Sequence, residues 1–273
     1  MTEHAVIFAA AHPLIGVLTE AEAEGSPRRP AVVFLNAGML HRVGPNRLHV
    51  RIARELARRG FVSFRFDRSG VGDSPPRTDG LPLRAAALGD VRDALDFLAA
   101  KGAASTFVLV GLCSGADLAF RAAASDERVV GAVFIDGLPY HTLRSRLHHY
   151  GSWLMRRGNW RRLLALDGPL WRRLLRPRQQ ARPADAVRRR DVPLRHEAES
   201  RLREFARRGM RLLLLYTADR DYSYPRHFAD TFPGVRSERI DVAYFRDADH
   251  TFTLRANQDL LVRRIDEWIS CFK

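Results

Sequence analysis

Two residues with reactive side chains lie next to each other in the stretch LVGLCSGADLAF, residues 109–120. An apolar run ends at Gly111, turns through Cys113 and Ser114, passes Gly115 and continues with helical spacing. A strand, a sharp turn and a helix are the context in which a nucleophile is held between two small residues. Either the sulfur or the hydroxyl could be that nucleophile, attacking an acyl carbon.

The size of the flanking residues decides between the two. With Cys113 at the centre, both flanking residues are glycines. With Ser114 at the centre they are Leu112 and Ala116, and leucine would clash where the helix approaches the strand. The spacing therefore favours Cys113 as the nucleophile. It also places the backbone N–H of Ser114 in one half of an oxyanion hole. The helix start favours a thiolate as well. The alternative is a plain strand-to-helix turn with a buried thiol.

The elements that must position Cys113 alternate along the chain. Continuous apolar runs predict strands, and apolar residues at helical spacing predict helices. An antiparallel pair is expected near the start, at residues 5–10 and 14–21. Further strands are expected at 31–36, 61–67, 106–111, 129–136, 210–217 and 239–245, with helices at 46–60, 88–102 and 256–272. This order predicts an α/β fold, with a mostly parallel sheet and helices on both faces.

Composition excludes several classes of protein. The 273 residues are 46% hydrophobic, and no apolar run approaches the length of a membrane span. The first residues lack the basic start of a signal peptide. The two cysteines, Cys113 and Cys271, are expected to be unpaired in a reducing cytoplasm. No Cys/His cluster has metal-ligand spacing, so we predict no metal and no cofactor.

Positive charge is concentrated in one segment. Residues 141–209 hold 19 arginines, no lysine and six acidic residues, and so carry +13 of the chain's net +14. Arginine binds phosphate and carboxylate groups in two-pronged fashion, which favours an acidic partner. The alternative is a compositional bias toward arginine on solvated helices. Nucleic acid is an improbable partner because no recognition motif accompanies the charge.

Several motifs together resemble the α/β-hydrolase superfamily over nearly the whole chain. FRFDRSGVGDS, residues 64–74, resembles that family's turn after a strand, and FRDADHTFT, residues 245–253, resembles its histidine loop. The resemblance implies an α/β-hydrolase core at 1–139 and 210–273, with a helical, Arg-rich cap at 140–209. It also implies His250 as the catalytic base.

The resemblance further implies an acid after the strand that follows the cap. Asp221 is preferred, because it lies three residues after a small residue and shortly before a proline. Asp219 is the lesser candidate, and Asp136, at the end of an earlier strand, is the third.

The loop after residues 31–36 is expected to supply the second oxyanion donor, the backbone N–H of Met39 or Leu40. Asn36 departs there from the family's usual histidine. Arg42 is a candidate ligand contact, with a solvated arginine as the alternative.

With its Gly-x-Cys-x-Gly elbow, the chain also resembles hydrolases and acyltransferases of biosynthetic gene clusters. A thiol nucleophile suggests thioester substrates, because exchange between thioesters is nearly thermoneutral. We therefore expect acyl transfer or thioester cleavage with donors on coenzyme A or an acyl or peptidyl carrier protein, and Arg172 and Arg173 of the cap as partner contacts. The alternatives are a hydrolase that releases the acyl group to water and a catalytically silent binding protein.

Overall fold

The computed structural model describes residues 1–22, 29–145, 147–148, 192–220 and 222–272. Within them, eight strands form one sheet in the order β1-β2-β4-β3-β5-β6-β7-β8. The strands are β1 (Glu3–Phe8), β2 (Leu14–Thr19), β3 (Ala31–Leu35), β4 (Ser63–Phe66), β5 (Phe107–Leu112), β6 (Val129–Ile135), β7 (Arg211–Thr217) and β8 (Ile240–Phe245). The helices are η1 (Pro45–Arg47), α1 (Leu48–Arg58), α2 (Leu83–Ala100), α3 (Ser114–Ser125), α8 (Arg195–Arg207), α9 (His227–Thr231) and α10 (Arg255–Ile269).

The strand directions confirm the predicted sheet. β1 pairs antiparallel with β2, and β2 pairs antiparallel with β4. All other neighbouring pairs, from β4 to β8, are parallel. Parallel strands must be buried on both faces, because their crossover helices cover both, and this explains the unbroken apolar runs in the sequence.

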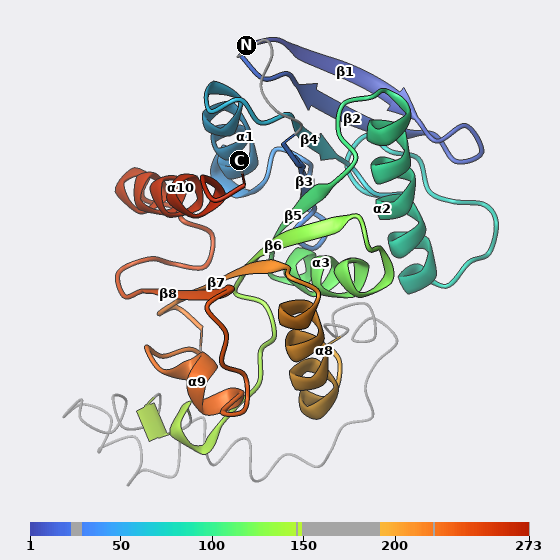
Figure 1. Ribbon diagram of the computed structural model, residues 1–273. Helices are drawn as coiled ribbons and strands as arrows, with labels where there is room; N and C mark the ends of the chain where they lie inside the picture. The colour runs from blue at the N-terminus through green and yellow to red at the C-terminus, as the bar shows by residue number, and fades with distance from the viewer. Residues whose placement is uncertain (23–28, 146, 149–191, 221, 273) are drawn as a thin grey trace, which may run out of the picture.

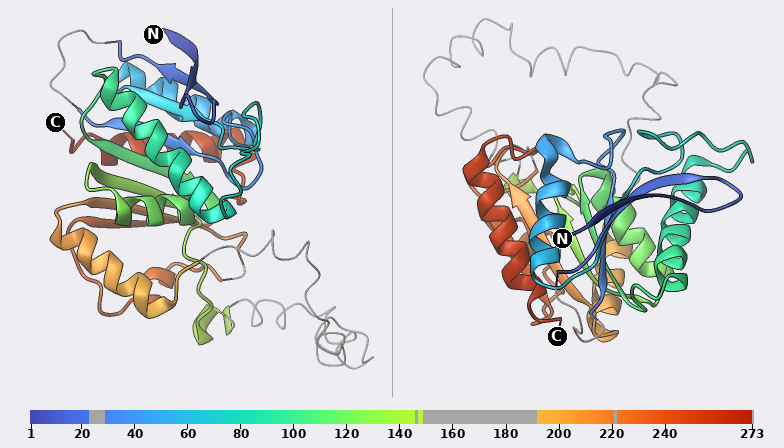
Figure 2. Two further views of the ribbon diagram at one scale, coloured as in Figure 1. Left: turned by 90° about the vertical axis from the view of Figure 1, so that its right-hand side faces the viewer. Right: turned by 90° about the horizontal axis from the view of Figure 1, so that it is seen from above.

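Helices cover the two faces of the sheet in separate layers. Helices α1 and α10 pack on one face, and α2, α3 and α8 pack on the other (Figures 1 and 2). In β3, alternate side chains serve both layers, with Val33 and Leu35 on the α2/α3 side and Val32 and Phe34 on the α1 side. The described residues thus form two apolar cores, one on each side of the sheet.

Helix α8 lies within the segment that the sequence assigned to the cap. Its apolar side chains Ala198, Leu202 and Phe205 are fully buried in the same core as α3. The Phe205 ring stands edge-on to Phe120 of α3, with the centroids 5.3 Å apart. By its packing, therefore, α8 is part of the core layer. Residues 149–191, which make up most of the predicted cap, lie outside the described residues.

The parallel strands bring several loops together. Because β3 to β8 run the same way, the loops that follow them gather at the carboxyl edge of the sheet, where α/β folds place their sites. The segments that carry Met39, Cys113, Asp136, Asp219 and His250 all follow such strands. In the part of the chain that the structure describes, no helix combines the length and apolarity that a membrane crossing requires.

Candidate active site

Cys113 occupies the sharp turn between β5 and α3. Its backbone is strained, with φ at 58° and ψ at −121°, a conformation that residues with side chains rarely adopt. The turn is held to the sheet by the Cys113 N–H, which donates to the carbonyl of Ile135 on β6 at 2.8 Å. The Cys113 side chain is half-buried. The sulfur is thus presented at the sheet edge by the geometry that the sequence predicted.

The two flanking glycines are required by close backbone packing. A Cβ at Gly111 would lie 2.2 Å from the carbonyl oxygen of Gly115. A Cβ at Gly115 would lie 2.7 Å from the carbonyl oxygen of Asn36. Neither backbone atom can move without displacing β3 or α3. The spacing of the glycines around Cys113 therefore reflects a steric need on both sides of the turn.

His250 stands between Cys113 and a buried carboxylate. Its Nδ1 lies 2.7 Å from Oδ2 of Asp136, whose side chain is fully buried. A hydrogen bond also links the His250 ring to Cys113. Because Nδ1 faces Asp136, Nε2 is the nitrogen available to the sulfur. The three side chains form a chain of contacts from acid to base to thiol.

The pKa of His250 reflects these contacts. Burial lowers the pKa of His250, but the hydrogen bonds to Asp136 and Cys113 outweigh it, so the pKa lies above its usual value. The guanidinium of Arg220 opposes this rise through repulsion of the imidazolium. An imidazole with a raised pKa is a stronger proton acceptor, as a base that takes a proton from a thiol must be.

The carboxylate beside the His250 ring belongs to Asp136, the third candidate from the sequence. Asp136 ends β6, has a φ of 48°, and accepts from the backbone N–H of Thr217 at 2.8 Å and from its hydroxyl at 2.7 Å. Asp219 instead accepts from the backbone N–H of His250 at 3.3 Å and holds the loop. Asp221 lies outside the described residues. Among the described residues, the carboxylate that contacts the His250 ring therefore comes from the end of β6, and the preference for Asp221 stays a prediction.

Asn36 holds the loop that was expected to supply the second oxyanion donor. Its side-chain amide donates to the carbonyl of Leu40 at 2.9 Å and to Asp67 at 3.0 Å. The backbone N–H of Leu40 is used by the carbonyl of Ala37. Of the two expected donors, this favours Met39, whose side chain is exposed. Asn36 thus stands where the family usually has a histidine, and its side chain organises the loop.

The Ser114 hydroxyl joins this loop to the elbow. Its Oγ accepts from the backbone N–H of Gly38 at 2.7 Å. The sequence assigned a role only to the Ser114 backbone. The side chain adds a second one, because it positions the residue just before Met39.

We expect Ser114→Ala to slow acylation of Cys113 about three- to tenfold, because one neutral hydrogen bond contributes about 1 kcal/mol. Alkylation of Cys113 by iodoacetamide needs no oxyanion hole and should be unchanged, which rapid-quench mass spectrometry measures. Equal losses in both reactions would mean that the hydroxyl acts on the sulfur itself.

Arg42 lies in a network of loop charges. Its Nη1 lies 2.5 Å from Oδ2 of the fully buried Asp67 and 2.7 Å from Oδ2 of Asp73. His41 and these two carboxylates lie close enough together to hold a cation, but the guanidinium already occupies the space between the carboxylates. A part for Arg42 in ligand binding stays a prediction.

A cationic group also touches the sulfur of Cys113. Arg220, in the segment after β7, has its Nη2 3.6 Å from Sγ. Sequence reasoning did not single it out, because it lies between the two aspartates that were compared as acids. Only its position two residues after Ala218 in a strand-end loop could have drawn attention to it.

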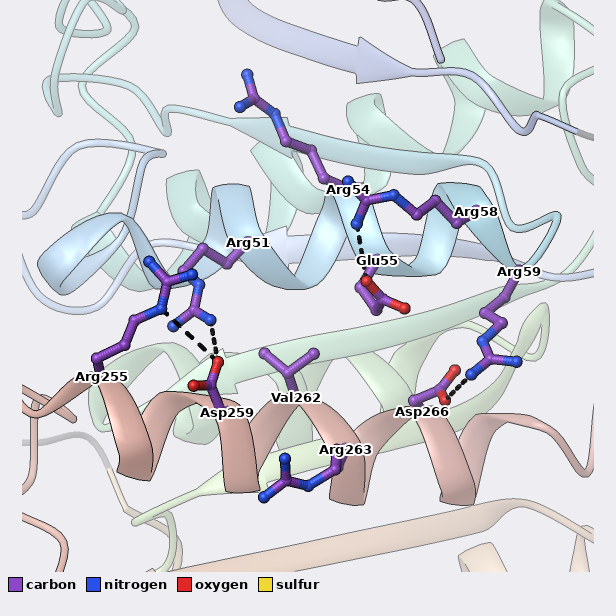
Figure 3. Close-up of a pocket in the computed structure, with 10 residues that line it drawn as sticks. All are labelled: Arg51, Arg54, Glu55, Arg58, Arg59, Arg255, Asp259, Val262, Arg263 and Asp266. Carbon is purple, nitrogen blue, oxygen red and sulfur yellow. Dashed lines mark hydrogen bonds and ion pairs between the residues drawn. The ribbon is translucent and has the colours of Figure 1, made fainter.

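A groove of about 450 Å³ lies away from these residues, between α1 and α10 (Figure 3). Arginines and acids line it in pairs. Arg58 lies 2.8 Å from Glu55, and Arg59 lies 2.8 Å from Asp266. The first pair lies within α1, and the second joins the end of α1 to α10 across the groove. Arg172 and Arg173, the expected partner contacts, lie outside the described residues.

Comparisons with known proteins agree with this architecture. The model of the alpha/beta hydrolase family matches residues 32–264. A comparison with curated protein sequences finds no match. An esterase of Pyrococcus furiosus aligns with a TM-score of 0.64 at 12% identity, over 99% of this chain and 91% of that one.

Two further solved structures align over similar lengths. An α/β serine hydrolase without a lid from Xanthomonas campestris gives a TM-score of 0.58 at 14% identity, over 99% of this chain and 94% of that one. A hypothetical protein from Pseudomonas aeruginosa gives 0.60 at 18%, over 98% and 94%. At such identities the likeness establishes the fold alone.

Proposed function

This chain belongs to the α/β-hydrolase family and is an enzyme of hydrolase type, and we propose that it moves or cleaves acyl groups held as thioesters, through an acyl-thioester on Cys113. The observation that carries the proposal is the contact chain from Cys113 through His250 to the buried Asp136. A base between a thiol and a carboxylate is the arrangement that activates a nucleophile in acyl transfer.

The first half of the reaction forms the acyl-enzyme. Nε2 of His250 takes the proton of the Cys113 thiol, and Asp136 stabilises the imidazolium. The sulfur attacks the acyl carbon, and the carbonyl oxygen becomes an oxyanion facing the backbone N–H groups of Ser114 and Met39. The carbon–sulfur bond to the donor then breaks, and the imidazolium returns its proton to the departing thiolate.

The second half passes the acyl group on. His250 takes a proton from an acceptor thiol, amine or alcohol, or from water, and that acceptor attacks the acyl-S-Cys113 carbonyl. The bond to Cys113 breaks and the sulfur regains the proton. A thiol nucleophile supports thioester donors, because a thioester formed from another thioester costs little free energy. Formation of the same thioester from an oxyester donor would be unfavourable in free energy.

The direct test is mass spectrometry of the intact protein after incubation with acyl thioesters. We expect a mass increase equal to the acyl group, located on Cys113 by peptide mapping. Discharge of that adduct by added thiols, amines or water then identifies the acceptor class. A chain that never acquires the acyl group, with short, long and charged thioesters all tried, does not carry this function.

An acidic donor, coenzyme A or an acyl carrier protein, is part of the proposal because of the charge of residues 141–209. Exposed arginines contribute little to stability but raise the encounter rate with an acidic partner. The effect weakens as salt shortens the Debye length to about 8 Å and below.

We expect added salt to slow acylation from a carrier protein sharply, and to leave acylation from an uncharged thioester mimic nearly unchanged. Charge reversal at Arg172 and Arg173 should slow only the carrier reaction. Stopped-flow or quench measurements at increasing ionic strength check both. Equal responses of both donors would remove the acidic partner from the proposal and leave the thioester chemistry in place.

A further inference from the structure

Arg220 is the charged side chain in direct contact with the candidate nucleophile. Its Nη2 lies 3.6 Å from the Cys113 sulfur, within hydrogen-bond distance for a sulfur acceptor. Arg220 is half-buried, and among the described residues its Nε is buried without a hydrogen-bond partner. Burial makes an ionic contact stronger, because less water screens it. The guanidinium is therefore placed to act on the charge of the sulfur.

Other charged groups surround the elbow from several elements. They are Asp117 on α3, Asp136 after β6, Asp219 in the same segment as Arg220, His250 after β8, and Arg68 after β4. Asp136 is hydrogen-bonded to His250 and Thr217. Asp219 accepts from the His250 backbone, and Asp117 accepts from the Leu138 backbone. Arg68 donates to the Gly38 carbonyl at 3.0 Å.

The His250 ring and Arg220 thus reach the sulfur by different routes. His250 can carry a positive charge only after it takes a proton, and Asp136 supports that charge. A guanidinium group, by contrast, carries its positive charge without taking a proton from the thiol. A thiolate beside a permanent cation needs no proton on the histidine.

We propose that Arg220 is a catalytic residue that holds Cys113 as a thiolate, so that His250 stays free to act as the base toward the acceptor. The inference rests on the proposed role of Cys113 as the nucleophile. The step involves a proton alone: the thiol proton leaves to solvent, and the sulfur keeps the electron pair beside the guanidinium. The thiolate then attacks the acyl carbon, the carbon–sulfur bond to the donor breaks, and the donor departs as a thiolate that takes its proton from solvent.

The rate of alkylation by iodoacetamide, measured site by site from pH 5 to 10, tests this without any acyl donor. Cys271 serves as an internal reference, because burial raises the pKa of the Cys271 thiol. In the native protein we expect Cys113 to become reactive at a lower pH than Cys271.

Arg220→Gln should raise the pH midpoint for Cys113 by about 1 unit or more, since an opposite charge within hydrogen-bond reach shifts ionisation by about 1–3 units. At pH 7 the rate of Cys113 alkylation in this variant should fall about three- to tenfold, because less of the thiol is ionised. The loss is no larger because a more basic thiolate is also more nucleophilic. Arg220→Lys, which keeps the charge, should lie between Arg220→Gln and the native protein.

Arg226→Gln is the matched control. Arg226 lies in the same segment between β7 and α9, its side chain is 71% exposed, and its nearest acid is Asp230 at 3.9 Å. Arg226→Gln removes the same charge from the protein at a position away from the sulfur. The pH midpoint of Cys113 alkylation should therefore stay at its native value. The inference is overturned if Arg220→Gln and Arg226→Gln give the same midpoint as the native protein.

The two proposals fail separately. In one outcome, the protein shows a low pH midpoint for Cys113 alkylation that depends on Arg220 and yet accepts no acyl group. That result would rule out the thioester function and leave the pairing of Arg220 with the Cys113 thiolate in place. Acylation of Cys113 at an unchanged rate in Arg220→Gln would keep the function and remove Arg220 from it. Melting temperatures of all three variants confirm that each is folded.

Discussion

Cys113→Ala is expected to abolish acyl-enzyme formation, with acyl transfer falling by about 10³-fold or more. The sulfur forms the bond to the acyl carbon in the proposed reaction, and alanine offers no atom in its place. Intact-mass measurement after incubation with an acyl thioester should show no adduct. The fold should be unaffected, since Cys113 is half-buried and the turn is held by its backbone.

Ser114→Ala is the matched control for this experiment, because it removes the adjacent reactive atom from the same turn. It should still acquire the acyl group, more slowly. An adduct that persists in Cys113→Ala and disappears in Ser114→Ala would falsify the assignment of the elbow. Cys113→Ser is informative in another way, because it shows whether the site tolerates an oxyester intermediate.

Asp136→Asn is expected to lower the rate of acyl transfer by about 10²–10⁴-fold, as the loss of the carboxylate in a nucleophile–histidine–acid triad does elsewhere. The imidazolium loses its counter-charge, and an amide at Oδ2 would point N–H groups at Nδ1 and force the wrong tautomer. The hydrogen bond that the His250 ring donates to Asp136 also raises the pKa of His250. The pKa of His250 should therefore fall in the variant, which NMR titration of the ring measures.

Asp219→Asn tests the alternative acid. Asp219 touches only the backbone of His250 among the contacts described here, so its amide should retain most of the activity and leave the pKa of the His250 ring near its native value. A severe loss in Asp219→Asn with a mild one in Asp136→Asn would reverse the assignment. Asp221→Asn belongs in the same series, because the sequence favoured that residue.

The order of the elements and the identity of the elbow could be predicted from the sequence because both depend on local pattern. Apolar runs between helical segments indicate a parallel sheet whatever their final neighbours. The glycines at 111 and 115 report a close approach between strand and helix, since a bulky residue at either position would overlap the backbone. The position of His250, in the loop between the last strand and the last helix, could also be predicted.

The contact between Asp136 and the His250 ring could not be found in this way, because it depends on which strand ends face each other. Asp219 has the expected sequence position, yet its carboxylate accepts from the backbone of His250, and Asp221 lies outside the described residues. The parallel pairing of β6 with β7 sets Asp136 beside Thr217, and a positive φ turns its carboxylate toward the His250 loop. That placement joins residues more than a hundred positions apart in the chain.

The sequence by itself therefore determined the fold, the turn and the residue at its centre, because the size and polarity of each residue limit the contacts it can make with its near neighbours. Only the tertiary structure decided which carboxylate supports His250, how the Ser114 hydroxyl holds Gly38, and that Arg220 reaches the sulfur. These contacts join loops that meet only when the sheet has formed. The physical reason is that hydrogen bonds and ion pairs act over a few ångströms, and spacing along the chain does not fix distances between strand ends.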